Sequence, residues 1–177
     1  NNLPNKTYRA DLNKLKVSLI TKIREKSNLM ENFCYTVIGA VPHNSKTGAS
    51  KDRLISFSKT ESTFKKYLEG KNVNRYSTIW DGRYLNYIPS EMHRPKFPEL
   101  FENEKLLIRN ISTSEGIMAT FDNNHYYVND TMSISIPWFK LKEVNQRGVN
   151  GSEQQNKLSS EIDLKYLLGL INSKLIN

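Results

Sequence analysis

The sequence predicts an α+β domain in which a twisted, mostly antiparallel sheet is flanked by helices. Short apolar segments separated by turn-forming residues fill the chain between residues 33 and 137, a pattern typical of antiparallel strands. An amphipathic helical pattern precedes these segments and another follows them. The 177 residues suffice for one domain with appended helices.

Amphipathic spacing predicts a first helix over residues 11–26, with Asp11 as its N-cap. A β-rich stretch follows and predicts a strand over residues 33–38. Turn formers dominate residues 41–52, which we expect to form a mobile loop.

A second helix is predicted over residues 61–69. Phe64, Tyr67 and Leu68 recur at helical spacing, so they would share the inward face. Gly70 then stands where a helix C-terminus favours glycine.

The strongest hairpin pattern joins residues 75–80 to residues 83–88 through the turn Asp81–Gly82. Four more short apolar segments, separated by polar turns, complete the predicted sheet. These strands are expected near residues 105–111, 117–121, 125–128 and 132–136.

The C-terminal part of the chain predicts a loop and then a helix. Residues 143–157 have no apolar periodicity, so we expect a flexible loop. Ser160 and Asp163 form a capping-box pattern for a helix over residues 163–175. The apolar stripe of this helix is Leu164, Leu167, Leu168, Ile171 and Leu175.

The net charge of +8 is unevenly distributed along the chain. Residues 1–28 hold seven Lys/Arg against two Asp/Glu, and residues 46–110 hold thirteen against eight. The remainder, from residue 111 on, is about neutral, with six against seven. Two basic blocks on a neutral scaffold indicate a polyanionic partner, while a merely solvated basic surface is the alternative.

Three other sequence features indicate the cellular environment of the protein and whether the chain is complete. Its one cysteine, Cys34, cannot form an internal disulfide, which favours a reducing, cytoplasmic environment. No apolar run reaches the roughly 18–20 residues of a membrane span, so no membrane partner is expected. The chain has no initiator Met and no signal-peptide pattern, and we interpret it as a fragment of a longer protein.

Motifs for catalysis are not found in the sequence. It contains no GxGxxG, Walker A, HExxH, CxxC or GxSxG pattern. His43, His93 and His125 have no spacing typical of a metal site, and Cys34 fits a buried, inert thiol. The sequence therefore indicates a binding module, with no catalytic residues and no metal site.

An ordered series of motifs carries a family resemblance over roughly residues 30–177. The series is FCYTVIG (33–39), YLEGKNVNRY (67–76), WDGRYLNYIP (80–89), EKLLIRNIS (104–112), ATFDNNHYYVNDTM (119–132) and DLKYLLGLINSKLIN (163–177). It resembles the TaqI-like C-terminal specificity domain, the target-recognition domain that follows the adenine methyltransferase domain in many restriction–modification enzymes. The resemblance implies a connector helix over residues 1–28 and a recognition domain over residues 29–177.

The resemblance implies that double-stranded DNA and a methyltransferase domain of the same polypeptide are the partners. The adenine methyltransferase signature Asn-Pro-Pro-Tyr/Phe and a PD-(D/E)xK nuclease set are absent from these residues. Catalysis is therefore expected upstream, with S-adenosylmethionine and possibly Mg²⁺ as cofactors there and none in this fragment. A fused endonuclease remains open.

Arg109 and Asn110, side by side at the end of an apolar strand, gain a role from this resemblance. Arg reads guanine edges bidentately and Asn reads adenine edges. Neighbours on a strand face opposite sides, so we expect Arg109 to meet DNA and Asn110 to secure a loop. The alternative for Arg109 is a structural ion pair with Glu102 or Glu104.

Other candidates for DNA contact are basic or amide residues in predicted loops, with Tyr76 as a residue that can stack or donate a hydrogen bond. The full candidate set is Lys46, Lys51, Arg53, Lys71, Asn72, Asn74, Arg75, Tyr76, Arg83, Arg109 and Asn110.

Two other functions remain open at this stage. The chain can be a protein-interaction or assembly module whose apolar terminal helices dock a partner. It can also be half of a type I specificity subunit, which differs in the catalytic chains that it recruits.

Overall fold

The computed structural model describes residues 14–44, 46–111, 116–174 and 176. The chain divides into two compact units, Asn1–Met30 and Glu31–Asn177. The smaller unit contains helix α1, Lys14–Lys26. Arg24 and Lys26 occupy its last turn, where cations interact favourably with the helix dipole. The start that the sequence predicts for this helix, residues 11–13, lies outside the described residues.

The first sheet of the larger unit is fully antiparallel, in the order β1-β10-β7-β8. Its strands are β1 (Cys34–Ile38), β7 (Lys105–Arg109), β8 (Ala119–Asp122) and β10 (Met132–Pro137). In β10 the large apolar residues Met132, Ile134 and Ile136 alternate with serines, and all three are fully buried. This alternation fixes the register, since a slip by one residue would exchange the two faces.

The second sheet has the order β2-β6-β3-β9, in which β9 runs parallel to β3 and the other pairs are antiparallel. Its strands are β2 (Ile55–Ser56), β3 (Phe64–Leu68), β6 (Tyr84–Asn86) and β9 (Tyr127–Val128). A third, two-stranded sheet consists of β4 (Val73–Asn74) and β5 (Ser77–Thr78). The predicted α+β class with a mostly antiparallel arrangement is confirmed.

The core of the larger unit lies where the sheets meet helix α2 (Glu99–Glu102). Phe101 stacks on Tyr127 with ring centroids 4.3 Å apart, and Tyr87 meets Tyr127 edge-on at 4.9 Å. Lys105 and Asp122 form an ion pair of 2.5 Å, and both side chains are fully buried. Burial lowers the pKa of Lys105, and the attraction of Asp122 opposes that shift.

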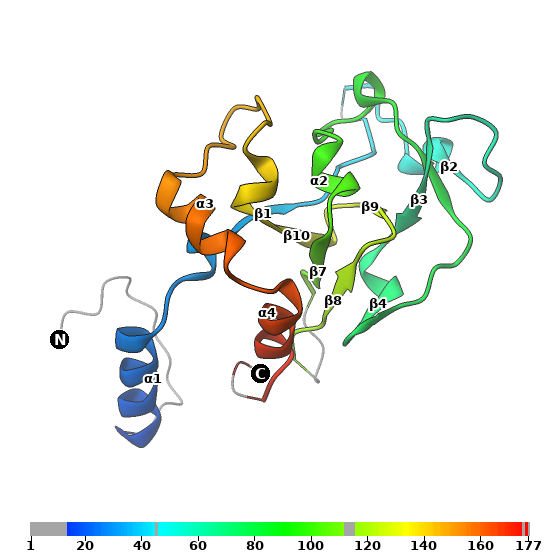
Figure 1. Cartoon of the computed structure of the whole chain (residues 1–177). Coiled ribbons are helices and arrows are strands. Elements are labelled where there is room, and N and C mark those ends of the chain that lie inside the picture. Colours follow the sequence, from blue (N-terminus) through cyan, green and yellow to red (C-terminus); the bar gives the residue numbers. More distant parts are fainter. Residues whose placement is uncertain (1–13, 45, 112–115, 175, 177) are drawn as a thin grey trace. The chain divides into compact units, whose positions relative to one another are not determined.

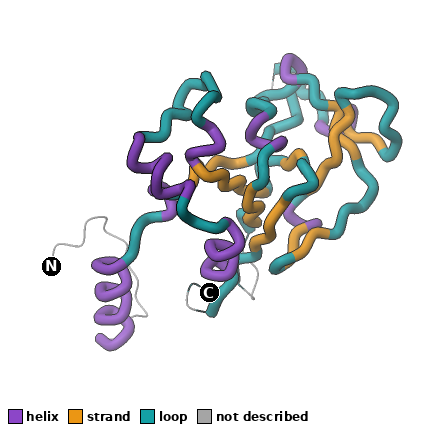
Figure 2. The backbone as a smooth tube through the Cα atoms, in the orientation of Figure 1, coloured by secondary structure: helices purple, strands orange, loops and turns teal. Residues whose placement is uncertain are grey.

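Helices α3 (Glu153–Ser160) and α4 (Leu164–Ile171) lie to one side of the first sheet, and the second sheet lies to the other (Figures 1 and 2). The apolar residues Leu164, Leu167 and Leu168 of α4 are buried. Asn172, just beyond α4, donates to the carbonyl of Ala119 at 2.9 Å and accepts from its N–H at 3.0 Å. These bonds fix the end of α4 to the start of β8.

The helix predicted over residues 61–69 is wrong, because this segment contains β3. Tyr67 and Leu68 are both fully buried, since this end of β3 pairs with β9 and is covered by the core. An apolar triplet at helical spacing is too short to separate a helix from a buried strand.

The hairpin predicted through Asp81–Gly82 is also wrong. The segment makes a turn, with Gly82 at φ 84°, but the strands on either side of it do not pair with each other. The strand before it, β5, pairs with β4, and the strand after it, β6, pairs with β2 and β3.

Two further expectations about the C-terminal part are corrected. The segment 143–157, expected to be a loop, contains the start of α3, and Ser152 caps that helix in a capping box with Gln155. Ser160 ends α3 and does not take part in capping α4; Asp163 alone is the N-cap, accepting from the N–H of Lys165 at 2.6 Å. The strands near 33–38, 105–111, 117–121 and 132–136 and a helix within 163–175 are confirmed.

Short 3₁₀ helices complete the fold at Met30–Asn32, Lys51–Leu54, Gly70–Asn72, Pro89–Glu91 and Trp138–Leu141. None of the helices in the described part of the chain has the length and apolar character that a membrane span requires.

Candidate nucleic-acid interface

The β4–β5 hairpin presents Arg75 and Tyr76 as its two-residue turn, since Asn74 pairs with Ser77. Tyr76 has φ 64°, in the left-handed region that a bulky side chain rarely adopts. Its side chain is 59% exposed. A strained and exposed aromatic residue at a turn is a candidate for a functional contact.

The hairpin packs against the ends of β7 and β8. The N–H of Tyr76 donates to the carbonyl of Ala119 at 2.9 Å, and Arg75 Nε donates to the carbonyl of Ile117 at 3.4 Å. The N–H of Arg109, the last residue of β7, donates to the carbonyl of Met118 at 3.0 Å. Segments far apart in the sequence thus bring Arg75, Tyr76 and Arg109 to one edge of the domain.

Thr131, in the turn between β9 and β10, connects two more candidates to this edge. Its carbonyl accepts from the N–H of Asn110 at 3.0 Å, and its hydroxyl accepts from the N–H of Gly70 at 2.9 Å. Gly70 directly precedes Lys71, whose side chain is 67% exposed. We call this surface the hairpin edge and define it by Lys71, Asn74, Arg75, Tyr76, Arg109 and Asn110.

Arg109 is half-buried and has no carboxylate partner among the described residues. Its Nη1 approaches the sulfur of Met118 at 3.3 Å, and its buried Nε has no hydrogen-bond partner. The carboxylates of the alternative ion pair are engaged elsewhere, Glu102 with Lys65 and Glu104 with Lys140. Since no carboxylate of the described residues neutralises it, the guanidinium charge can attract an external anionic or carbonyl acceptor.

Asn110 has a structural role. Its amide nitrogen donates to the carbonyl of Asp130 at 2.8 Å, and its amide oxygen accepts from the hydroxyl of Ser133 at 2.6 Å. Asn110 therefore secures the turn between β9 and β10.

Glu69 organises a second group of candidates. Its carboxylate pairs with Lys51, with Arg83 at 3.0 Å and with Lys71 at 3.7 Å. Burial raises the pKa of Glu69, but the hydrogen bonds from Lys51 and Arg83 outweigh burial, so its pKa lies below the ordinary value. Sequence reasoning missed this role, although Glu69 is a lone carboxylate within the basic segment 65–75.

Arg83 and Asn72 lie inside the domain rather than on its surface. Arg83 also pairs with Asp81 at 2.8 Å, and its side chain is only 12% exposed. Asn72 is buried; its amide donates to the carbonyl of Ile79 at 3.1 Å, and its oxygen accepts from Arg83 at 3.2 Å. Their contacts hold the segment between β3 and β6 in place beneath Lys71.

Two further candidates belong neither to the hairpin edge nor to the group around Glu69. Arg53 donates to the carbonyls of Ser50 at 2.8 Å and Glu91 at 2.5 Å, which holds it against neighbouring loops. Lys46 is exposed in the loop between β1 and β2, where its N–H donates to the side chain of Asn44 at 3.0 Å.

Metal-ligand types and the one cysteine are the remaining reactive groups. No three His, Cys, Asp or Glu side chains there are grouped as metal ligands would be. Burial raises the pKa of the Cys34 thiol to about 12, so the reactive thiolate is scarce at neutral pH.

Comparison with known proteins identifies one family. A search of curated proteins finds no match. A family model, the TaqI-like C-terminal specificity domain, matches residues 65–177. The match begins within β3 and includes every residue of the hairpin edge. The chain belongs to the TaqI-like C-terminal specificity domain family, whose members recognise DNA targets in restriction–modification enzymes.

Proposed function

We propose that this domain recognises its DNA target through the hairpin edge. It would hold the duplex so that a methyltransferase domain of the same polypeptide can methylate an adenine with S-adenosylmethionine. Catalysis, and any cleavage with Mg²⁺, would then belong to other domains of the enzyme. Residues 1–28 would act as the connector, and residues 29–177 as the recognition domain.

The observation that carries this proposal is the convergence of side chains suited to DNA on one edge. Lys71 and Arg75 come from one segment and Arg109 from another about 34 residues later, and all three can meet phosphates or base edges. Tyr76 projects beside them with an exposed ring. Positive charge positions a protein on the phosphate backbone, while the guanidinium and the ring supply contacts to bases.

The protein-interaction alternative rested on the apolar stripes of both terminal helices. In the C-terminal helix, Leu164, Leu167 and Leu168 are buried within the domain itself, so this part of its stripe is used in folding. In the N-terminal helix, Val17, Leu19 and Ile23 are exposed, so the alternative keeps that part of its argument.

The test is a titration of a fluorescently labelled duplex with the chain at several salt concentrations. We expect a Kd of about micromolar or weaker, with log Kd rising linearly with log salt, because most contacts of an isolated recognition domain go to phosphates. The variant Lys71→Gln/Arg75→Gln should reduce the salt slope by up to about two units.

The control variant Lys142→Gln/Lys157→Gln removes the same charge from exposed positions in the C-terminal part. This control variant should keep most of the dependence of log Kd on log salt. An affinity that does not depend on salt, or equal effects of the two double variants, would count against the hairpin edge as the DNA-binding surface.

A further inference from the structure

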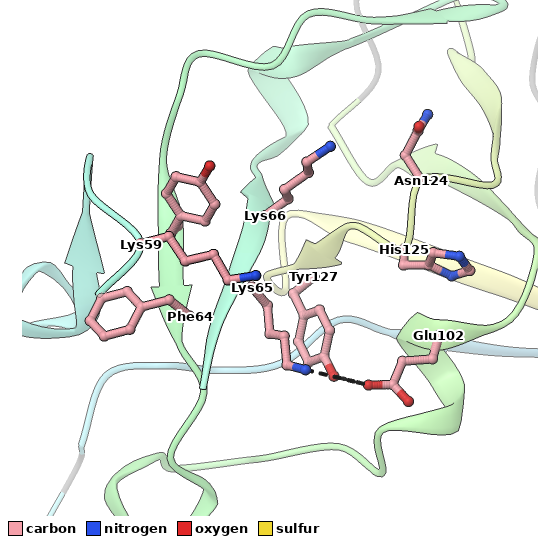
Figure 3. A pocket seen from close by; sticks show the side chains of 9 residues that line it. Lys59, Phe64, Lys65, Lys66, Glu102, Asn124, His125 and Tyr127 are labelled. Atoms are coloured by element: carbon pink, nitrogen blue, oxygen red, sulfur yellow. Dashed lines mark hydrogen bonds and ion pairs between the residues drawn. The ribbon is translucent and has the colours of Figure 1, made fainter. Parts of the chain in front are cut away.

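A pocket of about 430 Å³ lies away from the hairpin edge, between the second sheet and the turn that follows β8 (Figure 3). Three lysines, Lys59, Lys65 and Lys66, line it. We call it the lysine pocket. Its volume lies in the range of about 300–1,000 Å³ that is usual for small-ligand sites.

The charge in the lysine pocket is mainly positive. Figure 3 shows the side chains of Lys59 and Lys65 extending into it. Glu102 is its only carboxylate among the lining residues; it lies 3.7 Å from Lys65 and accepts from the hydroxyl of Tyr127 at 3.0 Å. Lys66 Nζ lies 5.4 Å from the centroid of the Trp80 ring, which is not among the lining residues. The ammonium groups of Lys59 and Lys65 against one carboxylate still leave an excess of positive charge, which favours an anionic ligand such as a phosphate.

The walls of the lysine pocket are aromatic. Phe64, Tyr84 and Tyr127 line it, and Lys65 Nζ lies 5.8 Å from the centroid of the Tyr127 ring. Phe64 and Tyr84 are only half-buried, so part of each ring is open to a ligand. Asn124 is exposed on the side of the pocket opposite Lys59 (Figure 3) and offers a donor and an acceptor.

The lysine pocket and the hairpin edge lie at opposite ends of the same strands. The pocket lies at the start of β3, beyond the end of β8 and before the start of β7. The hairpin edge lies beyond the end of β3, before the start of β8 and at the end of β7. Five residues of strand separate the two by roughly 15 Å, so they are distinct sites.

We propose that the lysine pocket binds a nucleotide unit, with its phosphate on Lys59 and Lys65 and its base against the aromatic walls beside Asn124. Lysines alone would suit any anion, whereas the open rings and the amide together suit a base with polar edges. The unit can come from a free nucleotide or from a nucleotide of a single strand of DNA, because both present the same chemistry. This proposal does not depend on the hairpin edge.

The test follows the ring signals of the three histidines by NMR during titration of the chain. His125 lines the lysine pocket, whereas His43 and His93 stack on each other elsewhere at 5.5 Å and serve as internal references. The probes are AMP, TMP, a short single-stranded oligothymidylate and inorganic phosphate. We expect the nucleotides or the oligonucleotide to shift His125 saturably while His43 and His93 stay in place.

The variant Lys59→Gln/Lys65→Gln should weaken this binding by about tenfold or more, because charge-assisted bonds to phosphate are lost. Lys142→Gln/Lys157→Gln, with the same charge change, should leave it unaltered. Tighter binding of the mononucleotides assigns a free nucleotide, and tighter binding of the oligonucleotide assigns a DNA strand.

Several outcomes would overturn the proposal: no saturable shift of His125, equal binding of inorganic phosphate and the nucleotides, or equal effects of the two double variants. The variant Lys71→Gln/Arg75→Gln should retain nucleotide binding. The histidine titration therefore tests nucleotide binding by the lysine pocket, and the duplex titration separately tests DNA binding by the hairpin edge.

Discussion

Glu69 pairs with two neighbouring cations, Arg83 and Lys71, whose exposure differs. Arg83 is held by Glu69 and Asp81 and is almost covered, whereas Lys71 keeps two thirds of its side chain exposed. Both residues are basic and lie near each other in the sequence, so composition alone treats them alike. Their environments separate a structural arginine from a lysine that can reach a phosphate.

The network around Glu69 predicts a pH dependence of stability. Burial raises its pKa, but the bonds from Lys51 and Arg83 prevail and place the pKa below its ordinary, unfolded value. The stabilisation is therefore fully present above the unfolded pKa and is lost as the pH falls through the folded pKa. Glu69→Gln should lower the free energy of unfolding by about 1–3 kcal/mol at pH 7 and by much less at pH 3.

Urea unfolding at the two pH values measures this difference. Glu104→Gln is the control, because Glu104 is half exposed in its pair with Lys140 and a surface pair contributes at most about 1 kcal/mol. A Glu69→Gln loss of equal size at both pH values would show that the carboxylate charge is not what stabilises the network.

At the scale of the element, the β4–β5 hairpin combines a strained residue with an exposed ring. A non-glycine residue in the left-handed region costs about 1–2 kcal/mol, and glycine costs about 0.5–1 kcal/mol in backbone entropy. Tyr76→Gly should therefore leave stability unchanged or raise it by up to about 1.5 kcal/mol. If the ring stacks on a base, the same change should weaken duplex binding by about 1–3 kcal/mol.

Thermal unfolding and duplex titration of the same sample measure both effects. Tyr166→Ala removes another exposed tyrosine, on α4, and should leave duplex affinity unaltered. Loss of stability without loss of affinity in Tyr76→Gly would assign Tyr76 to the fold instead of to DNA.

The strands with alternating or continuous apolar residues were predictable from the sequence, and the segment containing β3 was not. In β10, the alternation of Met132, Ile134 and Ile136 with serines predicts a strand locally. In β3, adjacent Tyr67 and Leu68 are both buried because of the pairing with β9, about 60 residues later in the chain. Local spacing cannot reveal such a long-range parallel partner.

The candidate site was predictable only in part, because local sequence patterns do not reveal which distant segments pair. The sequence singles out Arg109 and Asn110, and the segment of Lys71, Arg75 and Tyr76, as separate candidates. Only the pairing of β4 with β5 and the bonds to Met118, Ala119 and Thr131 bring them to one edge. The lysine pocket was missed, because its residues lie in a segment predicted to be a helix, in two predicted strands and in the stretches between them.

At the scale of the whole molecule, the larger unit has cations at both ends of its central strands. The hairpin edge and the lysine pocket each contain several, whereas the C-terminal third is about neutral. The basic block of residues 46–110 thus supplies two separate basic sites in space. The family assignment implies that the domain recognises DNA, and our proposal is that the hairpin edge makes that contact.

Target discrimination by the complete enzyme that carries this domain tests the central claim most directly. The preferred site is first selected from a pool of random duplexes, and binding is then measured on a panel with single base-pair changes. Arg109→Ala should reduce discrimination at one base pair by roughly 1–3 kcal/mol, because a bidentate base contact is lost. Lys71→Ala should weaken binding to every duplex about equally and reduce the salt slope by about one unit. If Arg109→Ala instead keeps the full discrimination profile and lowers the melting temperature by many degrees, Arg109 is a structural residue and the hairpin edge does not read the target through it.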